Sequence, residues 1–508
     1  MTVRVKSTIY TFISSIVYQA IILLSGFLVR RAFLNSIGVD FLGVDGFFST
    51  IISMLNLLDL GVGASSVFFM SKAFAKRDRQ EVVSVYRVYQ TFYKYIALIM
   101  LFLGIIISFN ISRFVNVGSY EVKFLQVVFL LQFARTISSY LLICPRTALQ
   151  CNQKNYICIT LDSISAIVFM IVKLIVITKT GNYMYYLVIM LSEIIVVNLF
   201  IRFIFRKEFP EVKKRIKLNE KNKKEVSKYA SSIVFSNIND FVYRSTDNMV
   251  LTTFLGFRTV GFMSNYYYIF NAIEALFAQI FLSVAASVTN YIHDDDVNEN
   301  ENVTKLFYTV FFVGFLLTLF CSICLFGLTN GFITIAFGSQ YVLDDNIKMV
   351  MTATFSIVSM QVPLYMYISG KGLINKEVLF SIACTVVNLT ISIVLVQKIG
   401  TLGVLLGTLS SSILFFTMRA RLVITNIIHE PWRFVKTAVI YFGAITIGLF
   451  TIQNIFVFHI NSWTLLVLKG LCCLVVFVLI SLIFIRCTEF SQVIMMISSS
   501  LGRKEVKK

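Results

Sequence analysis

Long apolar stretches alternate with short polar loops along almost the whole chain. Each stretch is long enough to cross a bilayer, whose hydrocarbon core of about 30 Å needs a helix of roughly 20 apolar residues. About fourteen such segments fit on the sequence. They lie at 7–31, 41–71, 84–110, 119–146, 156–178, 182–205, 224–254, 259–291, 304–328, 346–370, 376–397, 402–420, 434–456 and 463–486. Because these runs are continuous and do not alternate between apolar and polar positions, the pattern predicts an all-α polytopic membrane protein.

A basic stretch divides the pattern after the sixth segment. It predicts a basic cytoplasmic linker at 207–223 between two six-helix lobes, 1–206 and 224–424, which enclose a central cavity. Two additional transmembrane helices follow at 425–488, and a basic cytoplasmic tail at 489–508. A weak repeat agrees with this division, since Phe33 matches Phe254 and Val39 matches Val260 at one constant offset.

Composition and charge exclude a water-soluble protein. Hydrophobic residues make up 57% of the chain and charged residues 14%, with a mean hydropathy of +0.81. If both termini are cytoplasmic, about 32 of the 45 Lys and Arg residues lie on the cytoplasmic side, as the positive-inside rule requires. The net charge of +19 then reflects topology and contact with anionic lipids, so no nucleic-acid partner is needed.

The loops leave little room for catalysis. The polar segments are too short to fold a soluble catalytic domain, and the sequence contains no G-x-x-x-x-G-K-[ST] phosphate loop. Cys321 and Cys324 form a C-x-x-C inside an apolar segment without His partners, which favours small core residues over a metal or redox site. We therefore expect no enzyme activity, no metal site and no ATP hydrolysis.

Arginines inside the apolar segments are the candidates for substrate binding. A charge near the bilayer centre costs roughly 2.5–3.5 kcal/mol on insertion scales, so each one needs a partner, water or a function. Guanidinium groups match phosphate oxygens, which predicts a cationic cavity for an anionic head group. The proposed cavity cations are Arg30, Arg31, Arg135, Arg146 and Arg244. The alternative is snorkelling towards the interface, which fits residues near predicted helix ends: Arg30, Arg31, Lys94, Arg146 and Lys173.

Acidic residues in the same segments are candidates for coupling to a Na+ or H+ gradient. The carboxylates of this set are Asp45, Asp59, Glu193, Asp240, Asp247 and Glu274. Asp240 and Arg244 are spaced i,i+4 on the predicted seventh helix, so they can pair. Salt bridges and helix capping are the competing roles for each carboxylate. A coupling ion is the only cofactor that the sequence suggests.

Two motifs resemble a known family. L-L-D-L-G-V-G at 57–63 and T-D-N-M-V at 246–250, which F-L-G follows at 254–256, are similar to segments of the polysaccharide-transporter family. This family is the Wzx-like, lipid-linked oligosaccharide flippase branch of the multidrug/oligosaccharidyl-lipid/polysaccharide exporter (MOP) superfamily. The resemblance covers about residues 7–424 and marks the superfamily better than the substrate.

The resemblance implies a flippase. It would carry an undecaprenyl-pyrophosphate-linked oligosaccharide across the bacterial cytoplasmic membrane by alternating access, for capsule, O-antigen or exopolysaccharide synthesis. Its partners would be membrane lipids and the polymerase and glycosyltransferases of the pathway. A lipid II flippase of peptidoglycan synthesis is the alternative, while an Arg-rich cavity disfavours a cationic drug exporter. A membrane polymerase or glycosyltransferase, from a different class, would need a larger outer loop with catalytic groups.

The distribution of basic residues makes the topology testable. With both termini cytoplasmic, alkaline phosphatase fused after Lys217 should be inactive, and the same enzyme fused near Asp344 should be active outside the membrane. Reporter activity is measured in intact cells at matched expression. An active fusion after Lys217, or an inactive one near Asp344, contradicts the orientation.

Overall fold

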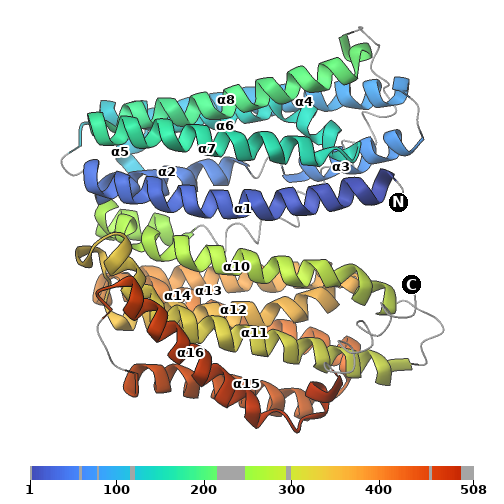
Figure 1. Ribbon diagram of the computed structural model, residues 1–508, viewed down its shortest axis with the longest axis vertical. Coiled ribbons are helices and arrows are strands. Elements are labelled where there is room, and N and C mark those ends of the chain that lie inside the picture. The colour runs from blue at the N-terminus through green and yellow to red at the C-terminus, as the bar shows by residue number, and fades with distance from the viewer. Residues whose placement is uncertain are drawn as a thin grey trace. The chain divides into compact units, whose positions relative to one another are not determined.

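The protein folds into helices, which divide into two compact units. The computed structural model describes residues 3–56, 60–76, 79–114, 120–213, 246–292, 299–456 and 460–492. The first unit comprises Met1–Gly261 and the second Phe262–Lys508. Figure 1 colours the chain from blue in the first unit to red at the end of the second.

Long apolar helices form the N-terminal unit. Its elements are α1 (Val3–Ser36), α2 (Val39–Leu55), α3 (Leu60–Ala75), α4 (Arg79–Phe109), α5 (Ile111–Phe114), α6 (Val122–Cys151), α7 (Asn155–Thr180), α8 (Tyr183–Glu208) and the 3-10 turn η2 (Pro210–Lys213). Helix α6 is central, because it packs against α4, α7 and α8, while α1 packs along α7. Phe129 and Phe133, one turn apart on α6, stack with ring centroids 5.5 Å apart inside this core.

The C-terminal unit contains most of α10 and the helices that follow it. They are α10 (Phe257–Ile292), which begins in the first unit, α11 (Glu299–Ala336), η3 (Ser339–Tyr341), α12 (Asp345–Gly370), α13 (Ile374–Ile399), α14 (Thr401–Val423), the π-helical turn η4 (Ile424–Ile428), α15 (Pro431–Asn454) and α16 (Trp463–Ile483). Helix α11 contacts α12, α15 and α16. The last two helices therefore pack onto the unit and belong to its core.

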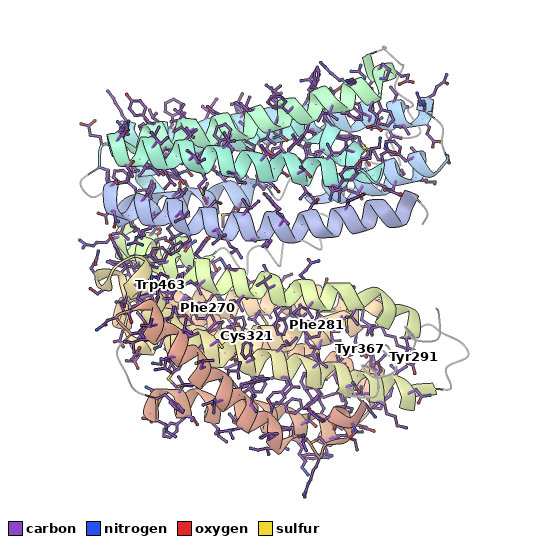
Figure 2. The ribbon with its side chains drawn as sticks, viewed as in Figure 1. Phe270, Phe281, Tyr291, Cys321, Tyr367 and Trp463 are labelled. Carbon is purple, nitrogen blue, oxygen red and sulfur yellow. The ribbon has the colours of Figure 1, made fainter. Side chains whose placement is uncertain are left out.

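Aromatic side chains join α11 to its neighbours. Phe315 stacks on Tyr441 of α15 with ring centroids 4.1 Å apart. Phe307, two turns earlier, packs edge-on against Tyr367 of α12 at 5.1 Å. Tyr367 is labelled in Figure 2. Such offset and edge-on ring pairs contribute about 0.5–1.5 kcal/mol each beyond area burial, so they fix how these helices meet.

The outward faces of the helices are apolar. Phe102 and Phe109 on α4, and Leu471 and Leu479 on α16, are more than half exposed. Many other large apolar side chains on these helices are also exposed, which suits contact with lipid. Eleven helices in the described residues are long and apolar enough to cross a membrane. The expected all-α, multi-pass membrane architecture is confirmed.

Three expected spans are not among those eleven. The segment predicted at 41–71 is divided between α2 and α3, which have 17 and 16 residues, and residues 57–59 between them lie outside the description. Most of 224–254 is also outside the described residues, and 259–291 corresponds to α10. The linker expected at 207–223, and with it the lobe boundaries drawn from the sequence, is described only as far as 213 and stays a prediction.

Two glycines let α14 approach α13 closely. Gly403 and Gly407 are spaced as G-x-x-x-G and face the same neighbour. A Cβ atom on Gly407 would lie 2.2 Å from Oγ of Ser392 and 2.9 Å from the backbone oxygen of Asn388. Asn388 in turn donates a hydrogen bond to Oγ1 of Thr408 at 3.1 Å. Close packing and polar contacts thus hold this helix pair together.

Gly407→Ala should lower the apparent melting temperature of the purified protein in detergent. The added methyl group has no space, and overpacking costs roughly 1–3 kcal/mol. Gly443→Ala on α15 is the matched control, since a Cβ there meets nothing within 4 Å. The control should melt at the wild-type temperature or slightly higher because Ala favours the helix. Equal melting temperatures for both variants would contradict close packing at Gly407.

Candidate functional site

A polar cavity lies inside the N-terminal unit, between α2, α6 and α8. Its volume is about 200 Å³. We call it the N-terminal cavity, and its lining residues are Asp45, Ser49, Ile52, Ser53, Asn56, Leu131, Gln132, Arg135, Thr136, Leu187 and Met190. The residues from α2 follow helical spacing, so one face of that helix supplies a stripe of polar groups. A polar cavity among apolar spanning helices is a default position for a binding site.

The carboxylate of Asp45 is held at the wall of this cavity. Its Oδ1 accepts hydrogen bonds from Nε2 of Gln132 at 2.7 Å and from the hydroxyl of Tyr183 at 2.9 Å. Gln132 and Tyr183 are buried and also contact each other at 3.1 Å. Three helices therefore fix the orientation of one acidic group. Pre-organised groups bind a ligand at a lower entropic cost.

Among the expected cavity cations that the structure describes, Arg135 lines the N-terminal cavity. Its side chain is exposed, and it follows Gln132 by three positions, so both project from one face of α6. Arg30 on α1 and Arg135 are both close enough for their charges to act on the Asp45 carboxylate. The guanidinium of Arg135 can donate two parallel hydrogen bonds to an anion, and the nearby carboxylate of Asp45 can bind a cation or a proton.

Arg146 is held in an ion pair on the same helix. Its two terminal nitrogens donate to the carboxylate oxygens of Asp162 on α7 at 2.6 and 2.9 Å. A longer contact of 3.3 Å reaches Oδ1 of Asn198 on α8. This bidentate geometry saturates much of the guanidinium with partners from the protein. The structure thus places Arg146 in a helix-joining position.

Glu193 is likewise paired. Its carboxylate lies 2.5 Å from Nζ of Lys173, and both side chains are mostly buried between α7 and α8. Lys173, expected to snorkel, instead reaches a neighbouring helix. A buried carboxylate and ammonium that satisfy one another need no bound ion.

The other expected site residues do not line the N-terminal cavity or lie outside the described residues. Arg31 on α1 is exposed. Asp247 lies half-buried in the helical residues 246–255, next to Asn248, which donates to Oγ1 of Thr50 at 3.2 Å. Glu274 is half-buried on α10. Asp59, Asp240 and Arg244 lie outside the described residues, so their roles stay predictions.

One buried charge cluster has no counterpart in the sequence analysis. Arg419 falls at the end of the segment predicted at 402–420, and the structure places it in α14 with its side chain only 13% exposed. It pairs with Glu377 of α13 and donates to Oε1 of Gln361 on α12 at 2.9 Å. Glu377 can be recognised in the sequence as an acidic residue in the first turn of α13. Its pairing with Arg419 cannot, because spacing along the chain does not show which helices pack together.

Comparisons with solved structures show where this architecture recurs. The lipid II flippase MurJ in an inward closed conformation matches with a TM-score of 0.63 at 18% identity, over 95% of this chain and 99% of that one. An inward-facing multidrug resistance MATE-family transporter of the MOP superfamily gives 0.60 at 15% identity, over 80% and 98%. A MOP-superfamily transporter from Pyrococcus furiosus gives 0.54 at 13% identity, over 82% and 95%.

The chain has the fold of MOP-superfamily transporters. Identities this low establish likeness of fold, which agrees with the superfamily suggested by the sequence motifs. These three matched proteins are a flippase and two transporters. No protein-family model matches the sequence, and a search of curated proteins finds no match.

The pairing of Arg146 can be separated from substrate binding by measuring stability. Arg146→Gln should lower the melting temperature, because breaking a buried pair costs roughly 3–5 kcal/mol and partial exposure brings this to about 1–3 kcal/mol. Adding Asp162→Asn should restore part of the loss. Lys76→Gln, which breaks the exposed pair with Glu81, serves as the control and should change little.

A different result would reassign the residue. If Arg146→Gln melts at the wild-type temperature yet loses transport, the guanidinium acts on substrate, as the sequence analysis predicted.

Proposed function

We propose that the protein flips an undecaprenyl-pyrophosphate-linked oligosaccharide across the bacterial cytoplasmic membrane by alternating access, for capsule, O-antigen or exopolysaccharide synthesis. The observation that carries the proposal is the exposed Arg135 side chain in a polar cavity within a transporter fold. A guanidinium group binds phosphate oxygens through two parallel N–H bonds. The pyrophosphate of such a lipid is the matching ligand.

The physical task agrees with this architecture. Glycan hydroxyls and a pyrophosphate cannot enter hydrocarbon unaided, since each unsatisfied polar group costs several kcal/mol. Polar groups of the N-terminal cavity, such as Ser49, Ser53 and Thr136, can replace part of the lost hydration. The prenyl tail can meanwhile stay in lipid beside the apolar outer faces of the helices.

Lipid II translocation is the second candidate function. The likeness to the lipid II flippase MurJ extends over 95% of this chain, whereas the two other transporters match 80% and 82%. Of the three structures named above, the one that covers the largest share of this chain is thus a lipid II flippase. Both candidates require recognition of a pyrophosphate linked to a prenyl chain.

We further propose that a Na+ or H+ gradient drives the cycle. Asp45 lies within range of the charges of Arg30 and Arg135. A cation or proton that reaches this carboxylate weakens its attraction for the arginines and changes their affinity for a bound anion, which links the two movements. Asp247 and Glu274 are further candidates, as are Asp59 and Asp240, while the pairing of Glu193 with Lys173 favours a structural role for that residue.

The orientation and partners form part of the same proposal. Both termini would be cytoplasmic, and the polymerase and glycosyltransferases of the pathway would supply and use the lipid-linked glycan.

Arg135→Gln should abolish or strongly reduce flipping. One lost charged hydrogen-bonding group costs roughly 1.5–3 kcal/mol, equivalent to a ten- to hundredfold weaker interaction. Arg135→Lys should retain part of the activity because it keeps the charge without the donor fork. Flipping is measured in proteoliposomes with a labelled prenyl-pyrophosphate glycan, with and without imposed sodium and proton gradients.

Lys123→Gln is the matched control, since Lys123 is an exposed cation at the start of the same helix and lines no part of the cavity. Wild-type rates for Arg135→Gln at equal protein abundance would overturn the assignment of the cavity. Depletion in cells separates the substrates: loss of a surface glycan alone supports the first proposal, and loss of peptidoglycan synthesis supports lipid II.

A further inference from the structure

A second polar cavity lies in the C-terminal unit, where α11 and α12 meet the last two helices. Its volume is about 290 Å³. We call it the C-terminal cavity, and its lining residues are Phe326, Gly327, Asn330, Gly331, Thr334, Val342, Asp345, Lys348, Ile452, Gln453, Ile460, Asn461 and Lys469. It is separate from the residues assigned to transport above.

Positive charge exceeds negative charge among the described residues of this wall. Lys348 on α12 and Lys469 on α16 face one carboxylate, that of Asp345. Nζ of Lys348 lies 2.8 Å from Oδ1 of Asp345, and the Lys348 side chain is only 10% exposed. The same ammonium lies 4.4 Å from the centre of the Phe326 ring. The wall thus carries two ammonium groups and one carboxylate, and this excess of positive charge would attract an anion.

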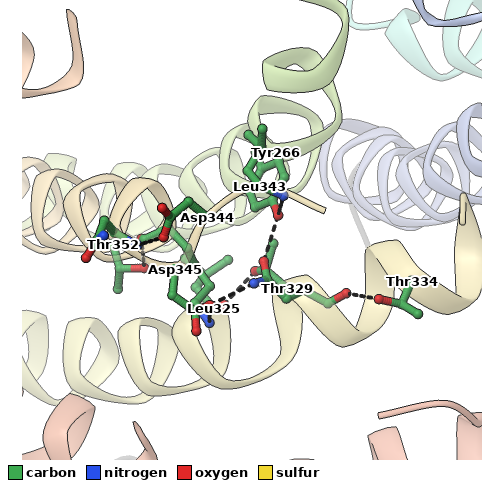
Figure 3. Close-up of polar contacts among 11 residues, drawn as sticks. Tyr266, Leu325, Thr329, Thr334, Leu343, Asp344, Asp345 and Thr352 are labelled. Atoms are coloured by element: carbon green, nitrogen blue, oxygen red, sulfur yellow. Dashed lines mark hydrogen bonds and ion pairs between the residues drawn. The ribbon is translucent and has the colours of Figure 1, made fainter. Parts of the chain in front are cut away.

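Hydrogen bonds hold this wall in place. The hydroxyl of Tyr266 accepts from the backbone nitrogen of Leu343 at 2.8 Å and donates to Oδ1 of Asn330 at 2.7 Å. Nδ2 of Asn330 donates to Oδ1 of Asp345 at 2.9 Å. Figure 3 shows this region, with Tyr266, Leu343 and Asp345 labelled. The segment before α12 is therefore tied to α10 and α11, so the cavity is pre-organised and does not depend on a ligand for its shape.

The surroundings favour a lipid as the source of the anion. Phe450 on α15 and Val467 on α16 are 66% and 63% exposed, on the helices that supply Gln453 and Lys469 to the cavity. Exposed apolar side chains can accommodate acyl chains. Amide groups of Gln453 and Asn461 supply both donors and acceptors, which suit the hydroxyls of a polar head group.

We propose that the C-terminal cavity binds the phosphate-ester head group of an anionic membrane lipid. Lys348 and Lys469 bind the phosphate oxygens, and Gln453 and Asn461 contact the head-group hydroxyls. The bound lipid bridges α12 and α16 and so fastens the last helix pair to the rest of the unit. By the topology predicted from the sequence, the site faces the outer leaflet.

The chain contains a natural reporter for this site. It has two tryptophans, and Trp463 lies at the start of α16, two residues after Asn461 and 6.1 Å between ring centroids from Phe332. Trp432→Phe leaves Trp463 as the single tryptophan, whose emission can be excited selectively at wavelengths where tyrosine does not absorb. We expect its emission to change when nanodiscs of phosphatidylcholine are replaced by nanodiscs that contain phosphatidylglycerol, with a saturable dependence on the phosphatidylglycerol fraction.

Lys469→Met in this background should shift that dependence to at least tenfold higher phosphatidylglycerol, because a charged phosphate contact is lost. Lys348→Met provides a second variant at the same cavity. Lys398→Met, an exposed cation at the end of α13, is the control for surface charge and should respond as the background does. Melting temperature should also rise with phosphatidylglycerol in the background protein and not in Lys469→Met.

Two soluble phosphate compounds test whether the bound anion comes from a lipid or from solution. Failure of glycerol 3-phosphate and inorganic phosphate to reproduce the response assigns the site to the intact lipid. A full response to either compound in phosphatidylcholine nanodiscs contradicts the assignment to a lipid and indicates a site for soluble phosphates. No response of Trp463 to phosphatidylglycerol, or equal shifts for Lys398→Met and Lys469→Met, overturns the proposal altogether.

Discussion

Polar groups inside a membrane must find their partners within the protein, and this requirement explains most of the structure. The backbone satisfies it by forming helices, since no water is available in hydrocarbon. Side chains satisfy it by pairing across helices: Arg146 with Asp162, Lys173 with Glu193, and Arg419 with Glu377. Each pair also selects which helices lie together. Charges that are costly in lipid thus become constraints on how the helices pack.

The remaining contacts between helices depend on shape. Lipid is as apolar as leucine, so burial alone offers little reason for spanning helices to associate. Rings that stack, such as Phe315 on Tyr441, and glycines that permit close approach, such as Gly403 and Gly407, provide the necessary complementarity. This is why each unit has a well-packed core although its outer faces are also hydrophobic.

Two polar cavities in the described part of the chain hold polar groups that are not all paired within the helix packing. In the N-terminal cavity, Asp45 is satisfied by Gln132 and Tyr183, while the Arg135 side chain remains exposed. In the C-terminal cavity, Asp345 pairs with Lys348, and Lys469 adds a further positive charge. Both combine a pre-organised carboxylate with cations, so both suit anionic ligands. They differ in their position, because the first is lined by α2, α6 and α8, and the second by α11, α12 and the last two helices with their connecting segment.

The sequence by itself determined the membrane environment, the helical class and most of the spans, because hydropathy over 20 residues is a local property that does not depend on neighbours. It also included Arg135 among the five proposed cavity cations, and the structure places this residue at the N-terminal cavity. It did not identify Tyr183 as a partner of Asp45, the ion pair of Arg146 with Asp162, or the burial of Arg419. These contacts depend on which helices become neighbours, and the spacing of residues along the chain does not show which helices those are. Whether a buried charge binds substrate or another helix was therefore decided only by the tertiary structure.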